Sequence, residues 1–497
     1  MIPMSLQDIA TVVGGRLHHV PDRGALVTAP PTLDPHKSSH GLFVALVLER
    51  PDGSRADNHP FAALAVSSGA VAVLTERPAE EPAVVVPDVR AALGVLAAHL
   101  VGRLSKTMVI GVTGSSGKTS TTDLTAHLLG YAGPTVATQR NFNDRIGLPL
   151  TITTADASTR YLVLEVAHHG PGDIRYLAGI ARPTVGAVLN VGTAHIGRFG
   201  SKQAIAHAKG ELVESLPADG LAVLNADDPL VRGMTDRTEA PVVLVGRAPD
   251  AEVRAEDVRL DRSGHAHFTL CTPEGRAPVT LGLFGEHFVT NALTAAAIAR
   301  HAGLSVDRIA AALGEVKAVT PGRMEVFERQ DGVTIIDDAY NAAPEAMRAS
   351  LTALAAMANG RDTIAVLGGM HKLGDASKEA HAEIGRLVAE LGICALIVIG
   401  GPEAPWLEEG ARWLEESARA HGADSVLVPS RQQARKMLHM LVEPGDLVLL
   451  KGARDAGLQQ LAQELRNDAP APAQPTRGPA RASAASSSVA DVTPARS

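Results

Sequence analysis

The stretch "GVTGSSGKTSTTDLTAHLLG", residues 111–130, decides the fold of this chain. The run "TMVIGV" that leads into it is apolar, β-branched and as long as a strand, and the residues from Lys118 onward have helical spacing and end on a glycine. A strand, a glycine-rich turn and a helix in this order are typical of a P-loop, whose backbone N–H groups and helix dipole hold phosphate. We therefore expect the loop to contact a nucleotide through Gly114, Ser115, Ser116, Gly117, Lys118, Thr119 and Ser120.

Two side chains of the loop have specific expected roles. Lys118 would reach the β- and γ-phosphates, and the Thr119 hydroxyl would hold Mg²⁺. The loop thus predicts that a nucleoside triphosphate binds. It does not distinguish a kinase, an ATPase, a GTPase or a ligase, because each of these classes has members that use such a loop.

Composition limits the remaining possibilities. A length of 497 residues suggests about three domains. Hydrophobic residues make up 45% of the chain and aromatic residues only 3%, which suits parallel strands alternating with helices. The net charge of −8 and the lack of a basic stripe argue against nucleic acid or an anionic membrane as partners. With two distant cysteines, no signal region and no long apolar run, we expect a cytoplasmic and soluble protein. We also expect a monomer.

The distribution of strand-like and helix-like segments predicts an α/β protein of three domains with a tail. Residues 1–105 have a mixed α/β pattern, and residues 106–319 contain the P-loop and a series of parallel strands. The pattern restarts over residues 320–467, where we expect a Rossmann-like domain. Residues 468–497 are rich in Pro, Ala and Ser, with little to bury, and should form a disordered tail.

Three polar residues stand close to predicted strand ends or on the helix that follows. Glu165 closes the strand "YLVLEV", at the edge where parallel sheets bind ligands, and a carboxylate there can coordinate Mg²⁺. His195 follows the strand "VGAVLN", and Lys209 lies on a predicted helix further along. Taken singly, each has an ordinary explanation: an ion pair, a hydrogen-bonded loop histidine and a solvated lysine.

Together these residues form a more specific pattern. The segment "NVGTAHIGRFGSKQAIAHAKGE", residues 190–211, resembles the Mur ligase family, the ATP-dependent amide-bond formers of peptidoglycan precursor synthesis. The resemblance covers roughly residues 1–465 and includes "NFNDRIGLPLT", "LEVAHHGPGDIRYL", "GEHFVTNALTAAAIA", "PGRMEVF", "IIDDAYNAAPEAM" and "KGARDAGL". It implies a ligase that adds D-alanyl-D-alanine to UDP-N-acetylmuramoyl-tripeptide through an acyl phosphate. ATP and Mg²⁺ would be its cofactors, and its substrates would be a carboxylic acid and an amino acid or dipeptide amine.

The resemblance also implies residue roles. Thr119 and Glu165 would hold one Mg²⁺, His195 would help to hold a second, and Lys209 corresponds to a carbamylated lysine on the metal side. A carbamate explains a lysine beside a cation site, where an ammonium would be repelled by about 4 kcal/mol per unit-charge pair at about 4 Å. With Lys118, these residues form the expected catalytic set. The adenosine side would be His287 and Asn291, with Arg323 and Asp338 contacting phosphate and ribose from the third domain, so we expect a closed active form.

The positions expected to face the acid substrate depart from the family pattern. The family holds UDP with an Asp-Ser-Arg segment, and this chain has Asp34, Pro35 and His36. Loss of the arginine should weaken the phosphate contact by about 1.5–3 kcal/mol, although His36 could still donate to a phosphate oxygen. Asp57, Asn58 and His59 stand for the family's Asp-Gly-His. The expected acid-substrate residues are Asp34, His36, Asn141 and Asn143.

Three functions therefore stay open. The first is the cell-wall ligase, and the second is a ligase of the same fold that acts on another carboxylic acid in a specialised pathway. The third is a protein that binds ATP without catalysis. Retention of Lys118, Thr119, Glu165, His195 and Lys209 argues against the third.

Overall fold

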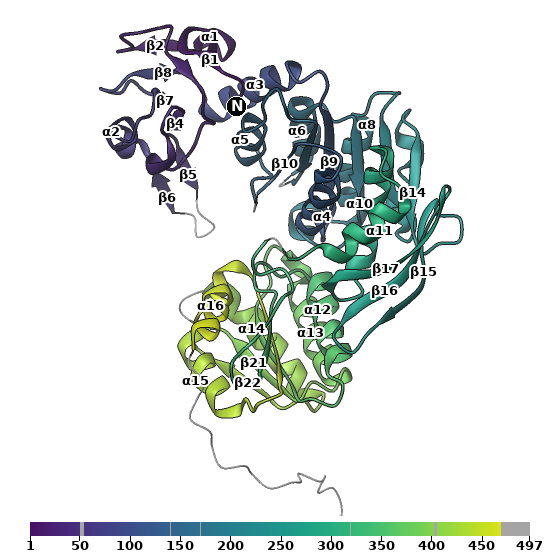
Figure 1. Cartoon of the computed structure of the whole chain (residues 1–497). Helices are drawn as coiled ribbons and strands as arrows, with labels where there is room; N and C mark the ends of the chain where they lie inside the picture. The colour runs from purple at the N-terminus through teal and green to yellow at the C-terminus, as the bar shows by residue number, and fades with distance from the viewer. Residues whose placement is uncertain (50–53, 140, 169, 319, 402–404, 469–497) are drawn as a thin grey trace, which may run out of the picture.

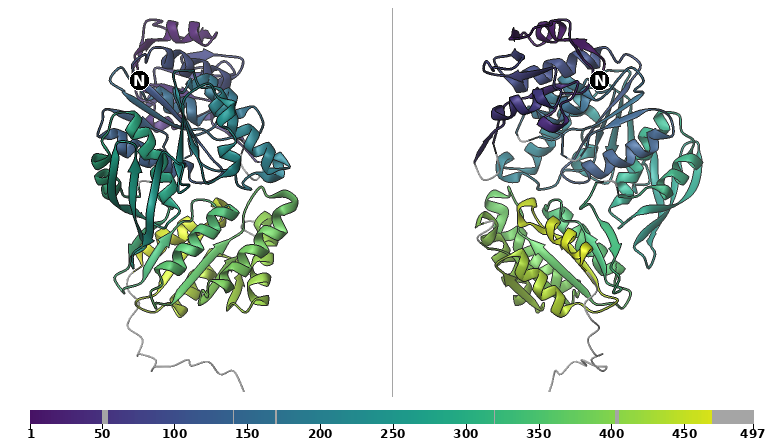
Figure 2. Two further views of the ribbon diagram at one scale, coloured as in Figure 1. Left: turned by 90° about the vertical axis from the view of Figure 1, so that its right-hand side faces the viewer. Right: turned by 60° about the vertical axis from the view of Figure 1, so that its left-hand side comes forward.

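The computed structural model describes residues 1–49, 54–139, 141–168, 170–318, 320–401 and 405–468. It confirms the predicted α/β fold with parallel-sheet domains (Figure 1). The N-terminal domain lies beside helices α5 and α6 of the central domain, and the C-terminal domain lies below the central domain in this view and in the turned views of Figure 2. The predicted disordered tail falls almost wholly outside the described residues. Its first residue, Asp468, accepts hydrogen bonds from Arg435.

The N-terminal domain is built on a small mixed sheet with the strand order β2-β8-β7-β4. Two short hairpin-like pairs, β1 with β3 and β5 with β6, flank it. Its elements are β1 (Met4–Ser5), α1 (Leu6–Val12), β2 (Arg16–His18), β3 (Leu26–Val27), η1 (Pro35–Lys37), β4 (Leu42–Val44), β5 (Val47–Glu49), β6 (Arg55–Asp57), η2 (His59–Phe61), α2 (Ala62–Ser67), β7 (Ala72–Thr75), β8 (Ala83–Val85) and α3 (Val89–Gly102).

Helix α3 joins this domain to the central one. It packs against α5 and α6, and an ideal Cβ on its Gly94 would come within 3.0 Å of Ile180 and Tyr176 on α6. Glycine at this position lets the two helices approach closely. The buried side chains of α3, among them Leu93 and Leu96, belong to the same apolar core as one face of the central sheet.

The central domain contains a nine-stranded sheet with the order β10-β11-β9-β12-β13-β14-β15-β16-β17. Its strands are β9 (Met108–Thr113), β10 (Thr135–Ala137), β11 (Tyr161–Glu165), β12 (Val185–Val188), β13 (Leu221–Asn225), β14 (Val242–Gly246), β15 (Val253–Leu260), β16 (His265–Thr272) and β17 (Gly275–Phe284). Its helices are α4 (Lys118–Gly130), α5 (Gly147–Thr153), α6 (Asp173–Ala181), α7 (Ile196–Phe199), α8 (Lys202–Glu214), α9 (Pro229–Arg232), η3 (Thr235–Arg237), α10 (Phe288–His301) and α11 (Val306–Glu315).

Strands β15, β16 and β17 form an antiparallel extension that the sequence analysis did not anticipate. Buried and less buried residues alternate along them, as expected for strands with one face on the core and one toward solvent. The extension contacts the C-terminal domain, where Asn359 Nδ2 donates to the Arg262 carbonyl at 2.6 Å. The central and C-terminal domains also share one apolar core.

The C-terminal domain has a six-stranded sheet with the order β18-β19-β23-β20-β21-β22, parallel except at the β18 edge. The domain contains β18 (Glu325–Glu328), β19 (Thr334–Asp337), α12 (Pro344–Met357), β20 (Thr363–Gly368), η4 (Gly374–Ala376), α13 (Ser377–Glu390), β21 (Ala395–Ile399), α14 (Pro405–Ala420), β22 (Ser425–Val428), α15 (Arg431–Leu441), β23 (Leu447–Lys451), η5 (Arg454–Ala456) and α16 (Leu458–Asn467). Within the described part of the chain, none of the helices is both long enough and apolar enough to cross a membrane.

Candidate active site

Three neighbouring parallel strands converge on the P-loop. Strand β9 leads into the loop, β11 ends beside it at Glu165, and β12 on the other side leads to the loop that carries His195. The carboxyl ends of parallel strands meet at one edge of a sheet, and this edge is where α/β proteins bind ligands. The sheet order thus places residues that are far apart in sequence in a single site.

The P-loop adopts the backbone that phosphate binding requires. Gly117 lies in the left-handed region with a φ of 77°, and an ideal Cβ there would stand 2.7 Å from Asn291 Oδ1 on α10. Both the conformation and the contact favour glycine at this position. Asn291, predicted on the adenosine side, is therefore buried directly against the loop.

Asn190 fixes the loop from the end of β12. The backbone N–H groups of Ser115 and Ser116 donate to Asn190 Oδ1 at 3.0 and 2.9 Å, and the Gly192 N–H donates to Ser115 Oγ at 2.9 Å. No role for Asn190 was predicted from the sequence. Its position at the end of "VGAVLN", two residues after β12, was the available signal, the same one that identified Glu165.

Lys118, Thr119 and Glu165 lie together as predicted. Thr119 Oγ1 donates to Glu165 Oε2 at 2.8 Å, Asn143 Nδ2 donates to Glu165 Oε1 at 2.6 Å, and Lys118 Nζ donates to the Gly114 carbonyl at 2.9 Å. Burial lowers the pKa of Lys118, and the Glu165 carboxylate opposes that shift. The hydroxyl and carboxylate oxygens are hard ligands of the kind Mg²⁺ prefers.

The residues present fit a magnesium ion shared with a nucleotide. Among the residues that the structure describes, no three or more His, Cys, Asp or Glu side chains form a cage that could hold a metal alone. Mg²⁺ in phosphoryl-transfer sites is held by one or two protein oxygens together with phosphates and waters. Thr119 and Glu165 supply such a pair of oxygens.

Lys209 is buried beside a histidine that the sequence analysis did not assign. Its Nζ lies 2.9 Å from His168 Nε2, and the side chain is 1% exposed. Burial, with a smaller contribution from the Lys118 charge, lowers the pKa of Lys209 well below its ordinary value, which favours the neutral amine. His168 belongs to the quoted motif "LEVAHHG", but only the fold shows that it faces Lys209.

His195 lies close to this pair. It precedes α7 with a φ of 67°, and its ring centroid is 5.9 Å from that of His168. Phe199 packs edge-on against His168 with ring centroids 4.7 Å apart. Glu165 thus lies beside the P-loop at the end of β11, and His195 and Lys209 lie near each other around His168.

Arg323 and Asp338, predicted to contact phosphate and ribose from the third domain, differ in their surroundings. Arg323 Nη2 donates to Thr119 Oγ1 at 3.3 Å, and its guanidinium stacks 4.2 Å from the centroid of the Tyr340 ring. Asp338 is bonded within its own domain, to Lys451 Nζ and Ser350 Oγ, both at 2.5 Å. Its contact with a ribose stays a prediction.

His287 is partly buried and precedes the first residue of α10. Burial lowers its pKa to about 4, with the Asp338 carboxylate opposing and the Lys451 ammonium adding to the shift. The ring is therefore neutral at physiological pH. A neutral imidazole can donate and accept hydrogen bonds, which suits the predicted position of His287 beside adenosine.

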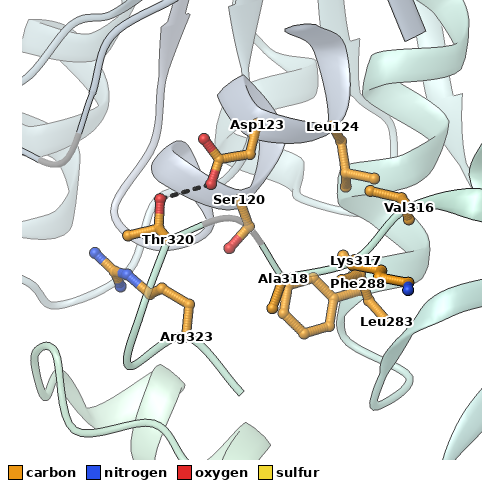
Figure 3. Close-up of a pocket in the computed structure, with 10 residues that line it drawn as sticks. All are labelled: Ser120, Asp123, Leu124, Leu283, Phe288, Val316, Lys317, Ala318, Thr320 and Arg323. Atoms are coloured by element: carbon orange, nitrogen blue, oxygen red, sulfur yellow. Dashed lines mark hydrogen bonds between the residues drawn. The ribbon is translucent and has the colours of Figure 1, made fainter. Parts of the chain in front are cut away.

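A small pocket beside the P-loop helix links the central domain to the C-terminal one (Figure 3). Ser120, Asp123 and Arg323 line it, and its volume of about 20 Å³ is too small for a nucleobase. Asp123 on α4 accepts a hydrogen bond of 2.7 Å from Thr320, which lies in the segment between the two domains (Figure 3). A nucleotide that used this space would need the two domains to shift.

Replacing Asp123 with Asn should stabilise the protein at pH 8 more than at pH 5. Burial raises the pKa of Asp123 from 3.8 to about 6, so the folded state loses stability through this group as pH rises across that window. The neutral amide should raise the free energy of unfolding by about 1–3 kcal/mol at pH 8. Denaturant unfolding at both pH values measures this, with the exposed Asp219→Asn as the control. Equal effects at the two pH values would contradict the assignment.

The C-terminal domain docks on the loop that carries His195. Glu345 Oε1, from α12, accepts hydrogen bonds from Thr193 N and Thr193 Oγ1 at 2.7 and 2.9 Å. An ideal Cβ on Gly192 would lie 2.6 Å from the Glu345 carboxylate, so only glycine fits there without a shift. Glu345 could not be identified from the sequence, because its partner Thr193 lies in another domain.

The residues predicted to contact the acid substrate do not all lie close together. Asn143 is half-buried and bonds to Glu165, whereas Asn141 is exposed. Asp34 and His36 lie in the N-terminal domain, where Asp34 caps η1 by accepting the His36 N–H at 3.0 Å. The His36 side chain is exposed.

The fold and the site define a P-loop nucleotide-binding protein built from three α/β domains. Comparison with known families and proteins is more specific. The Mur ligase middle domain matches residues 112–299, and the Mur ligase glutamate ligase domain matches residues 322–454. The chain is 42% identical to the UDP-N-acetylmuramoyl-tripeptide--D-alanyl-D-alanine ligase of Mycobacterium tuberculosis, over 94% of this chain and 98% of the relative. Its identity to the Escherichia coli ligase of the same name is 32%, over 94% and 99%.

Solved structures agree with these matches. The crystal structure of MurF from Acinetobacter baumannii superposes with a TM-score of 0.82 at 29% identity, covering 94% of this chain and 99% of that one. MurF from Thermotoga maritima in complex with ADP gives a TM-score of 0.74 at 29% identity, covering 88% and 97%. The chain belongs to the MurF group of the Mur ligase family.

Proposed function

We propose that this protein is an ATP-dependent ligase that joins D-alanyl-D-alanine to UDP-N-acetylmuramoyl-tripeptide and releases ADP and phosphate. Similarity to ligases of that name along 94% of the chain supports the substrates. The observation that carries the chemistry is the position of the buried Lys209. It lies against His168, three residues after the Glu165 that bonds to Thr119 of the P-loop, and it is close enough to Lys118 for that charge to help lower its pKa. ATP and Mg²⁺ are the cofactors, and we expect a monomer that works in the cytoplasm on small molecules.

Both chemical steps of the reaction take place at one point of the site. The substrate carboxylate attacks the γ-phosphorus, ADP leaves, and the amine then attacks the acyl carbon and displaces phosphate. Both steps gather negative charge, which is stabilised best by cations that are held in place beforehand. Lys118 provides one such cation, and Thr119 and Glu165 would hold Mg²⁺, which when bound supplies further positive charge at the transferring phosphate.

Lys209 is suited to carbamylation by its surroundings. A neutral amine forms an N–C bond with CO₂ and loses one proton, and His168 Nε2, 2.9 Å away, is positioned to accept it. The resulting carbamate is an anion in a region that Lys118 makes positive. It could therefore help to hold a cation together with His195, the role expected for both residues.

Domain contacts support the expectation of a closed active form. Glu345 and the loop at Lys372 both reach from the C-terminal domain to the His195 loop, where the Gly197 N–H donates to the Lys372 carbonyl at 3.3 Å. Such contacts can exclude water from an acyl phosphate, which water would otherwise hydrolyse.

The test is a ligation assay with the purified protein, ATP, Mg²⁺, UDP-N-acetylmuramoyl-tripeptide and D-alanyl-D-alanine. We expect ADP, phosphate and the new peptide in equal amounts, and no ATP consumption when either substrate is omitted. Release of AMP and pyrophosphate would contradict the acyl-phosphate route. Turnover only with another carboxylic acid would contradict the cell-wall substrate, and nucleotide binding without turnover for any acid would contradict catalysis.

A further inference from the structure

A cavity of about 310 Å³ lies in the N-terminal domain, apart from the P-loop. Ala45 and Val73 line it on the apolar side, and its charged or ionisable side chains are Asp57, His59, Arg77 and Glu81. Small-molecule pockets of this size have mostly apolar walls with a few polar groups that orient the ligand. The P-loop takes ATP, so the nucleoside diphosphate of the acid substrate needs a second pocket of this kind.

His59 presents a polar atom that nothing in the described structure satisfies. Its Nδ1 lies 2.6 Å from Asp57 Oδ1, which fixes the ring, and its side chain is 13% exposed. Its Nε2 is buried and has no hydrogen-bond partner among the described residues. A buried polar atom without a partner is rare in folded proteins, so Nε2 points to a ligand group.

The loop that carries these residues is held rigidly. Asn58 Oδ1 accepts the Leu46 N–H at 2.7 Å, and Asn58 Nδ2 donates to the Val44 carbonyl at 2.9 Å. Hydrogen bonds from the His59 backbone N–H, the His59 ring and Arg77 lower the pKa of Asp57 to about 2, so this carboxylate is ionised at neutral pH. The Asp57 carboxylate can therefore hold both the His59 ring and the Arg77 guanidinium in place.

Arg77 is the one Lys or Arg among the described residues that line the cavity. Its Nη2 lies 2.5 Å from Asp57 Oδ2, and the Thr75 hydroxyl hydrogen-bonds to both its backbone N–H and its carbonyl, at 3.2 and 3.0 Å. The side chain is 56% exposed, so part of the guanidinium fork reaches the solvent. A planar fork with several donors suits phosphate oxygens. His36 does not line the cavity.

We infer that Arg77 binds the diphosphate of the acid substrate, in place of the arginine absent at position 36, and that His59 Nε2 hydrogen-bonds the nucleobase in the adjoining cavity. The inference rests on the proposed function, since it takes the diphosphate from the UDP substrate. It assigns the positive charge that contacts the diphosphate to Arg77, because position 36 has a histidine in place of an arginine. The weakening expected from the sequence at His36 would then be offset by Arg77.

The test compares the binding of UDP and uridine to the full-length protein, with the P-loop saturated by ADP. Arg77→Ala should weaken UDP about 10- to 100-fold and leave uridine nearly unchanged, because only UDP has the diphosphate. Arg77→Lys should restore part of the loss, and the exposed Arg23→Ala should behave like the wild type. In the ligation assay, Arg77→Ala should raise the KM for the UDP substrate and leave kcat and the KM for ATP unchanged.

Three outcomes would overturn the inference or its premise. If Arg77→Ala binds UDP like the wild type and His36→Ala does not, the phosphate contact belongs to His36. If Arg77→Ala weakens uridine and UDP equally, Arg77 only supports Asp57 and His59. If the wild type binds ADP normally but neither uridine nor UDP, the proposed acid substrate itself is wrong.

Discussion

Replacing Lys209 with alanine should lower the rate of ligation by at least about 10²–10³-fold, the loss seen when one preorganised group at a charge-gathering site is removed. Binding of ATP should change by less than about twofold, because Lys209 is hydrogen-bonded to His168 and is expected to act through its carbamate. Lys209 is buried against His168, so the truncation leaves a small hole rather than a new surface. The measurements are kcat for ligation and the Kd of ATP.

Three controls distinguish loss of the carbamate from a packing defect. Lys202 lies on the same helix and is exposed, so Lys202→Ala should keep full activity. Added formate or acetate should restore part of the Lys209→Ala activity by filling the vacated anion site. Removal of CO₂ should slow the wild type, and bicarbonate should restore it, with no such response in the variant. Full activity of Lys209→Ala without additives would show that the carbamate assignment is wrong.

Much of the site was predictable because its signals are local. A glycine-rich turn between a strand and a helix identified the P-loop, and a carboxylate at a strand end identified Glu165. The sheet order β11-β9-β12 then makes these neighbours, as the strand-end rule for parallel sheets requires. The parallel sheets of the central and C-terminal domains were predictable for the same reason, since their strands are continuous apolar runs.

Residues that act only through the fold could not be found in this way. His168, Asn190 and Glu345 acquire roles from partners that lie 41, 74–75 and 152 residues away in sequence. No local pattern encodes such pairings. The antiparallel extension β15–β17 was missed although its strands alternate in burial, because the expectation of parallel strands was carried across the whole segment.

In the N-terminal domain, the family motif pointed to residues that do not line the cavity. Alignment with the Asp-Ser-Arg segment selected Asp34 and His36, which lie at the short helix η1, with the His36 side chain exposed. Arg77 follows Asp57 by 20 residues, and it meets Asp57 only because β6 and β7 end near the same cavity. The inferred role of Arg77 would supply, from the residues after β7, the cation that position 36 lacks, and an aligned motif does not show such a replacement.

Replacing Glu165 with glutamine should reduce kcat by about 10²–10³-fold and raise the Mg²⁺ concentration for half-maximal activity by at least about tenfold. Glutamine keeps the shape of the side chain and removes its charge. The Thr119 hydroxyl can rotate and accept a hydrogen bond from the new amide. A hydrogen bond between positions 119 and 165 is then kept, with donor and acceptor exchanged. The fold should persist, because Glu165 and its partners stay the same size.

The metal dependence is the readout that decides between two roles for Glu165. If its carboxylate holds Mg²⁺, ATP should still bind without the metal, and excess Mg²⁺ should recover part of the lost rate. The exposed Glu239→Gln, which removes one charge from the same domain, should change neither quantity. A loss of rate with an unchanged Mg²⁺ requirement would contradict metal binding. Glu165 would then act by orienting Thr119 and by supporting the charge of Lys118, whose pKa it raises against the effect of burial.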